Sequence, residues 1–188
     1  QLMELDVSGN YLKTLPKDIG NLIELRTLEV WDNSISFIPE EIGNLKELRK
    51  LNLTDNRLFS LPQEVGNITK LDRLYVGSNQ LIMIPKEIGN LNELQELYLN
   101  SNQLVRLPKE ISNLKNLRIL DAEENLLINV PENIKTMPQL KELSYVTSKL
   151  NSPMYQSVNL GYYNERRVVK IKEITPVTKN IGMDFNLY

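Results

Sequence analysis

The chain has 188 residues, of which 41% are apolar, and its formal net charge is −2. It contains no cysteine and no histidine, which excludes disulfides, zinc sites built from these residues, cysteine nucleophiles and histidine general bases. No stretch approaches the roughly 18 uninterrupted apolar residues of a membrane span. Binding to nucleic acid or to a membrane surface would need a concentrated basic patch, and the sequence has none.

One pattern recurs six times at an unvarying spacing of 23 residues: Leu-x-x-Leu-x-(Leu/Val)-x-x-Asn-x-(Leu/Ile)-x-x-(Leu/Ile)-Pro. A fixed period of this length is typical of a solenoid, in which each repeat forms one coil. The repeated asparagines are Asn10, Asn33, Asn56, Asn79, Asn102 and Asn125. The repeated prolines are Pro16, Pro39, Pro62, Pro85, Pro108 and Pro131.

The first half of each repeat predicts a short strand with one buried face. In the third repeat Leu51 and Leu53 alternate with Lys50 and Asn52, which is the period of a half-buried strand. We therefore expect the leucines to point into the core and the polar residues to point out. The asparagine that follows can both donate and accept hydrogen bonds, so stacked asparagines are expected to form a ladder that satisfies buried backbone groups.

The second half of each repeat predicts a short 3₁₀ or α turn that returns the chain on the convex side. Pro62 suits the first position of such a turn, and Glu64 complements its positive end. Gly66 is expected to end the turn in a left-handed conformation. The equivalent glycines of other repeats are Gly20, Gly43 and Gly89.

These motifs resemble the leucine-rich repeat family over residues 2 to about 147. The return segment Leu-Pro-x-x-Ile-Gly-Asn-Leu is similar to that of Ras-associated and Scribble-type intracellular scaffolds, and to repeat proteins of bacteria such as Leptospira and Bacteroides. The resemblance implies an α/β solenoid, an arc with a concave parallel β-sheet and short 3₁₀ or α turns on its convex side. The chain departs from the pattern at Ser112, Lys135 and Met137, and Ser148 replaces the seventh asparagine. We expect about six and a half repeats, in a solenoid over residues 1–148.

Both ends of the solenoid need covering, because terminal coils expose apolar surface and a strand edge. Residues 149–188 are expected to form a C-terminal cap or tail. Residues 167–174 alternate as a strand does, and the aromatic stretch 154–163 could pair with them as a hairpin. A docking segment or the start of another domain is the alternative. The chain opens on a repeat at Gln1-Leu2 with no visible cap, which predicts a processed form, a fragment or part of a longer protein.

The outward positions of the concave sheet are the candidate binding site that the resemblance implies. Trp31, Tyr75 and Tyr98 are of the residue types enriched at binding hot spots, although they could instead pack on one another and stiffen the sheet. Gly77 beside Tyr75 is expected to leave a depression for a partner side chain. The candidate partner-binding residues are Trp31, Tyr75, Tyr98, Lys50, Arg73, Asn52, Asn100, Glu29, Asp121 and Glu123. The charged members either steer a partner or form a plain solvated surface.

The chain offers no nucleophile–base pair and no phosphate-binding glycine loop, so we expect no enzymatic activity, no cofactor and no metal site. Asp121 and Glu123 have the oxygen ligands of a Ca²⁺ site, but surface carboxylates are the simpler interpretation.

The resemblance implies a non-enzymatic module that binds a protein partner of unknown identity on its concave face. If the chain is part of a cytoplasmic scaffold, the expected partner is a small GTPase or a phosphatase component. If it is a bacterial secreted or surface protein, the expected partner is a host protein or a surface protein. The lack of cysteine caps argues against an extracellular eukaryotic protein. The alternatives are a self-associating structural protein, including a homodimer through the uncapped end or the concave face, and the targeting arm of a larger signalling or secreted protein.

Overall fold

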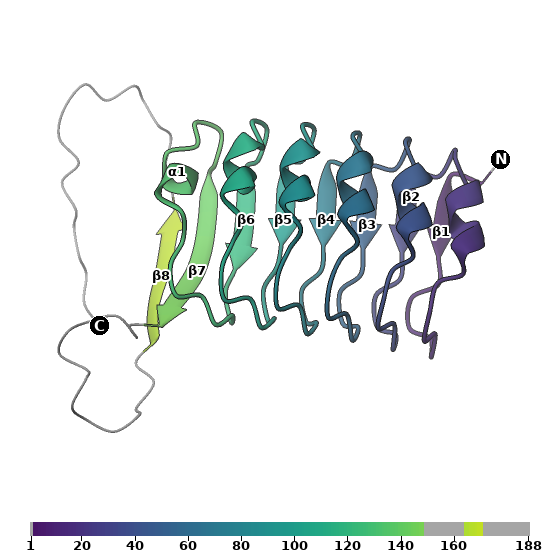
Figure 1. The fold of residues 1–188 in the computed structure, drawn as a ribbon, viewed down its shortest axis with the longest axis horizontal. Coiled ribbons are helices and arrows are strands. Elements are labelled where there is room, and N and C mark those ends of the chain that lie inside the picture. Colours follow the sequence, from purple (N-terminus) through teal and green to yellow (C-terminus); the bar gives the residue numbers. More distant parts are fainter. Residues whose placement is uncertain (1, 149–163, 171–188) are drawn as a thin grey trace.

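The computed structural model describes residues 2–148 and 164–170 and shows coils stacked in a single row (Figure 1). Each coil adds one short strand to a sheet of eight strands, whose spatial order is their order in the chain. The first seven strands are parallel. They are β1 (Glu4–Asp6), β2 (Thr27–Glu29), β3 (Lys50–Asn52), β4 (Arg73–Tyr75), β5 (Glu96–Tyr98), β6 (Ile119–Ala122) and β7 (Glu142–Ser148). We number the coils 1 to 7 with these strands.

Short helices return the chain along the other side, so one face of the sheet is covered and the other is left open (Figure 1). Five are 3₁₀ helices and the last is a single α turn, as the return segments predicted. They are η1 (Lys17–Asn21), η2 (Glu40–Asn44), η3 (Gln63–Asn67), η4 (Lys86–Asn90), η5 (Lys109–Asn113) and α1 (Glu132–Lys135). The α/β solenoid with a parallel sheet and short 3₁₀ turns is therefore confirmed.

The core is one continuous stack of leucine rows. Each strand residue pairs with the residue 23 positions later, so Leu28, Leu51 and Leu74 lie side by side and are completely buried. The same rows continue to Leu143, which is also buried. No coil can cover its own leucines, so each coil is stabilised by its two neighbours.

The repeated asparagines join neighbouring coils. The Asn56 amide donates to the backbone oxygens of Leu53 and Thr54 in its own coil and of Val30 in the preceding coil, at 3.0–3.2 Å. Its side-chain oxygen accepts the N–H of Ile35 at 3.0 Å. The same four-bond arrangement is found at Asn33, Asn79, Asn102 and Asn125. Asn10, in the first coil, donates only to its own coil, at Val7 and Ser8.

The left-handed backbone position lies directly before each of these asparagines, and the expectation that it lies in the convex turns was wrong. Gly9 and five non-glycine residues have φ between 51° and 62°. The five are Asp32, Asp55, Ser78, Ser101 and Glu124. Among the described residues no glycine of a 3₁₀ turn has a positive φ. The strain therefore lies where the strand bends and the asparagine turns inward.

The turn glycines are needed instead because neighbouring coils approach closely there. A Cβ built on Gly43 would lie 2.6 Å from the backbone oxygen of Glu64 in the next coil, and one on Gly20 would lie 2.7 Å from that of Glu41. The prolines also sit one position earlier than expected. Pro39 precedes η2 in an extended conformation (φ −66°, ψ 148°), and its carbonyl accepts the N–H of Ile42 at 3.1 Å.

The last described strand, β8 (Asn164–Lys170), pairs antiparallel with β7, with Tyr145 opposite Arg167. It overlaps the strand expected over residues 167–174, and residues 171–174 lie outside the described residues. The stretch 154–163, expected to pair as a hairpin, also lies outside them. Within the described chain, β8 occupies the edge that β7 would otherwise expose.

Candidate protein-binding face

The open face of the sheet carries the candidate residues in rows that follow the strand register. Pairing places Lys50 beside Arg73, Asn52 beside Tyr75, and Tyr75 beside Tyr98. The neighbouring coils carry Glu29 on β2 and Asp121 on β6, each in the same row as the tyrosines. The register thus places most of the candidate residues on one face, over β2 to β6.

The two tyrosines form a stacked pair at the centre of this face. Their ring centroids are 5.1 Å apart, and the ring planes are inclined by 23°. The Tyr75 hydroxyl donates to a carboxylate oxygen of Glu96 on β5, at 2.7 Å. Burial raises the pKa of Tyr75 above its ordinary value, and the nearby Glu96 carboxylate raises it further. The pKa of Tyr98 is also raised, first by burial and then by the charge of Glu96.

Lys50 links the tyrosine pair to β2. Its ammonium lies 5.6 Å from the centroid of the Tyr75 ring, within the range of a cation–π contact. It also forms an ion pair with one carboxylate oxygen of Glu29. The other oxygen of Glu29 is buried and has no hydrogen-bond partner among the described residues. Glu29, Lys50, Tyr75, Tyr98 and Glu96 therefore form one contiguous group, which we call the tyrosine cluster.

Arg73 does not reach across to the tyrosine cluster by a hydrogen bond. Its Nε donates to the carboxylate of the adjacent Asp72 at 2.9 Å, which raises the pKa of the guanidinium. Each of the two cations Lys50 and Arg73 is therefore matched by a carboxylate.

Trp31 lies apart from the tyrosine cluster. Its side chain is 42% exposed and follows β2 in coil 2, so coil 3 lies between it and Tyr75. On β6, at the other end of the candidate face, the Asp121 carboxylate accepts the backbone N–H of Glu123 at 3.1 Å. The side-chain oxygen of Asn52 accepts the N–H of Thr54 in the same way. The aromatic candidates thus form two groups and not one patch.

The depression expected beside Tyr75 is filled. The side-chain oxygen of Asn100 lies 2.6 Å from the point where a Cβ of Gly77 would be, and Gly77 is buried. Gly77 therefore makes room for a side chain of this chain, and the interpretation of a partner pocket at that position was wrong.

Sequence reasoning left Glu96 out of the candidate set, although the structure makes it the hydrogen-bond partner of Tyr75. The only signal in the sequence was that Glu96 lies at an outward position on the strand next to Tyr75. Two other long side chains lie at outward positions next to Tyr75 in the same way, so this signal does not single out Glu96.

Within residues 2–148 and 164–170, no group of three acidic, histidine or cysteine residues is placed to hold a metal ion. The described helices are all too short to cross a membrane.

Residues 2–97 and 77–182 match the model of the leucine-rich repeat region family, and the chain belongs to this family. A search of curated protein sequences gives no significant match.

Solved structures of repeat proteins are similar. A leucine-rich repeat protein of Leptospira interrogans is 36% identical, with a TM-score of 0.67 over 73% of this chain and 41% of its own. The ectodomain of the Arabidopsis thaliana receptor kinase GASSHO1/SCHENGEN3, in complex with CASPARIAN STRIP INTEGRITY FACTOR 2, is 32% identical, with a TM-score of 0.67 over 73% and 17%. The plant peptide hormone receptor RGFR1, in complex with RGF2, is 34% identical, with a TM-score of 0.68 over 74% and 23%. The match therefore spans less than half the length of each of these chains.

Proposed function

We propose that this chain is a non-enzymatic module that binds a protein or peptide partner on its concave face, centred on the tyrosine cluster. The observation that carries this proposal is the stacked pair of Tyr75 and Tyr98, which is held on rigid strands and only partly buried. Side chains already fixed in one arrangement lose little conformational entropy on binding. Tyrosine also combines a large apolar area with a polar group, as binding hot spots require.

The charges around the stack favour a partner with basic groups. Glu29 and Glu96 lie within the tyrosine cluster, and Asp121 and Glu123 follow on the next coil. Lys50 is matched by Glu29, and Arg73 by Asp72. The face is therefore acidic on balance. We propose that an apolar or aromatic side chain packs on the tyrosines while flanking basic residues meet these carboxylates.

The similar plant receptors support this proposal, since two of them are complexes with factors named in their titles. Trp31 forms a second, smaller contact in the proposal, two coils toward the N-terminus. The distance between the two groups suits a partner that extends across several coils rather than one that fills a single pocket.

A pull-down tests the proposal. The intact chain, a Tyr75→Ala/Tyr98→Ala variant and a Trp31→Ala variant are used as baits with a lysate of the organism that encodes the chain. Ile23→Ala is the matched control, because Ile23 is 55% exposed and lies outside this face. A protein captured by the intact chain and the control, but lost from the double tyrosine variant, supports the proposal. Equal capture by all folded baits contradicts it.

A further inference from the structure

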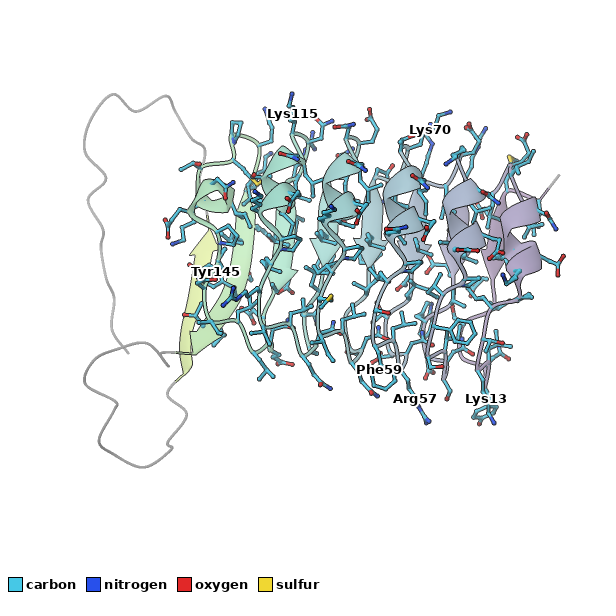
Figure 2. The ribbon with its side chains drawn as sticks, in the orientation of Figure 1. Lys13, Arg57, Phe59, Lys70, Lys115 and Tyr145 are labelled. Carbon is cyan, nitrogen blue, oxygen red and sulfur yellow. The ribbon has the colours of Figure 1, made fainter. Side chains whose placement is uncertain are left out.

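Six of the ten exposed large hydrophobic side chains of the described residues lie along one lateral edge of the solenoid, away from the concave face. They are Tyr11, Phe37, Phe59, Ile82, Met83 and Leu126. We define the lateral edge as the positions one, three and four residues after each repeated asparagine, in coils 1 to 6. Figure 2 shows Lys13, Arg57 and Phe59 projecting from this row of loops, on the side opposite Lys70 and Lys115.

The loops of the lateral edge are fixed side by side by backbone hydrogen bonds. Arg57 donates its N–H to the carbonyl of Ile35 at 2.9 Å, and Ile82 donates to Phe59 at 3.4 Å. Ile128 donates to Val105 at 3.1 Å between coils 5 and 6. The exposed side chains therefore stand in straight rows at the spacing of the strands, roughly 5 Å per coil.

Charge on the lateral edge is of one sign only. Of its eighteen positions, three are basic and none is acidic, although residues 1–150 as a whole carry more acidic than basic side chains. The basic residues are Lys13, Arg57 and Arg106, and all three are exposed. Exposed apolar side chains gathered along one edge and bordered by polar residues are typical of an interaction surface.

We propose that the lateral edge binds the lateral edge of a second copy of this chain, with the two rows of coils antiparallel. The two-fold axis runs from the concave to the convex side and passes between coils 3 and 4. Coil 1 then faces coil 6 of the second copy, coil 2 faces coil 5, and coil 3 faces coil 4. Because the interface is isologous, every contact occurs twice.

This register matches the exposed residues at both ends and at the centre. Tyr11, which is 94% exposed, faces Leu126, which is 57% exposed. Phe59 faces Ile82 next to the axis. Phe37 faces Arg106, a pairing that allows a cation–π contact.

The matching of apolar side chains chooses between this arrangement and its alternative. In the antiparallel register Tyr11 faces Leu126 and Phe59 faces Ile82, and no two cations meet. A two-fold axis along the solenoid would instead place coils in register and reverse the order of positions within each loop, so that Tyr11 would face Thr14 and Phe37 would face Ser34. That alternative sets exposed apolar side chains against polar ones, which leaves the antiparallel arrangement.

The size of the edge suits a stable dimer. Eighteen positions a side approach the roughly 20–30 residues per side of a standard interface. The axis leaves both concave faces open on the same side of the dimer. The inference is independent of what those faces bind, so it stands or falls separately from the proposed function.

Sedimentation of the full chain across a concentration series tests the proposal. The intact chain is expected to shift from the mass of one chain to that of two. Phe59→Lys, which places a cation at the centre twice per dimer, is expected to raise the dissociation constant by about 100-fold. Ile23→Lys, at an exposed apolar position off the edge, is expected to leave it unchanged. Circular dichroism checks that each variant is folded.

The register is tested by charge and by cross-linking. Gln80→Glu is expected to tighten the dimer by about two- to fivefold, because each new carboxylate faces Arg57, and Gln80→Lys is expected to weaken it. The chain has no cysteine of its own. A mixture of Tyr11→Cys and Leu126→Cys chains is therefore expected to cross-link on oxidation, whereas either variant alone is not.

A chain that remains a single copy up to about 100 µM overturns the proposal, since an interface of standard size would be occupied there. So does a dimer that folded Phe59→Lys leaves intact. Cross-linking of Tyr11→Cys with itself, or weakening by Gln80→Glu, would overturn the antiparallel register.

Discussion

Replacing Gly43 by alanine adds one methyl group at the closest approach of two coils. The new Cβ would lie 2.6 Å from the Glu64 backbone oxygen and 2.9 Å from the Glu64 Cβ, against 3.4 Å or more for ordinary contact. A backbone oxygen cannot rotate away, so η2 and η3 must separate by several tenths of an ångström. Overpacking of this kind costs about 1–3 kcal/mol. Loss of glycine's freedom in the unfolded chain offsets about 0.4–1 kcal/mol, so we expect a net loss of about 1–2 kcal/mol.

Urea unfolding followed by circular dichroism measures this loss, with Ser112→Ala as the matched control. Ser112 occupies the same position of its coil and already carries a Cβ, and its neighbour is the α turn of coil 6. It accepts a hydrogen bond from the exposed Asn133 amide at 2.7 Å, so its loss should cost less than about 1 kcal/mol. A Gly43→Ala variant as stable as the intact chain, or more stable, would refute the close-approach account and leave only conformational freedom to explain the glycine.

Three further outcomes are expected, and equilibrium unfolding measures each. Asn56→Ala should cost about 3 kcal/mol or more, because it leaves buried backbone groups of two coils unpaired, whereas Asn10→Ala, at an exposed position, should cost less than about 1 kcal/mol. Ser78→Gly should stabilise by about 0.5–1 kcal/mol, since the native φ of 51° suits glycine; a loss of stability would contradict this. The raised pKa of Tyr75 predicts stability that is complete below its ordinary pKa of 10.0 and falls as pH rises above it, so this alkaline loss should be smaller in Tyr75→Phe.

The sequence was sufficient for the repeat architecture because its signal is periodic and redundant. The alternation of Leu51 and Leu53 with polar residues, repeated every 23 positions, fixes both the strand and its buried face. The register then follows, since any slip would expose a row of leucines. The position of Tyr75 beside Tyr98 could be predicted for the same reason.

Features that depend on the contact between coils could not be predicted in this way. The turn glycine was assigned to the wrong cause, because close approach and a left-handed φ both favour glycine and the distances decide between them. The side chain that fills the space at Gly77 comes from Asn100, 23 residues later, and nothing local indicates its rotamer. The Tyr75–Glu96 hydrogen bond likewise depends on how two long side chains are oriented.

The central claim is that the tyrosine cluster binds the partner, and the most direct measurement is the affinity of the captured partner for single variants. Isothermal titration calorimetry would compare Tyr98→Ala, Glu96→Gln and the control Ile23→Ala with the intact chain. We expect Tyr98→Ala to weaken binding by about 30-fold or more, as loss of a hot-spot aromatic does, and Ile23→Ala to have no effect. Glu96→Gln should weaken it by a smaller factor that shrinks as salt is added. Unchanged affinity for folded Tyr98→Ala would contradict the claim and place the binding site elsewhere on the solenoid.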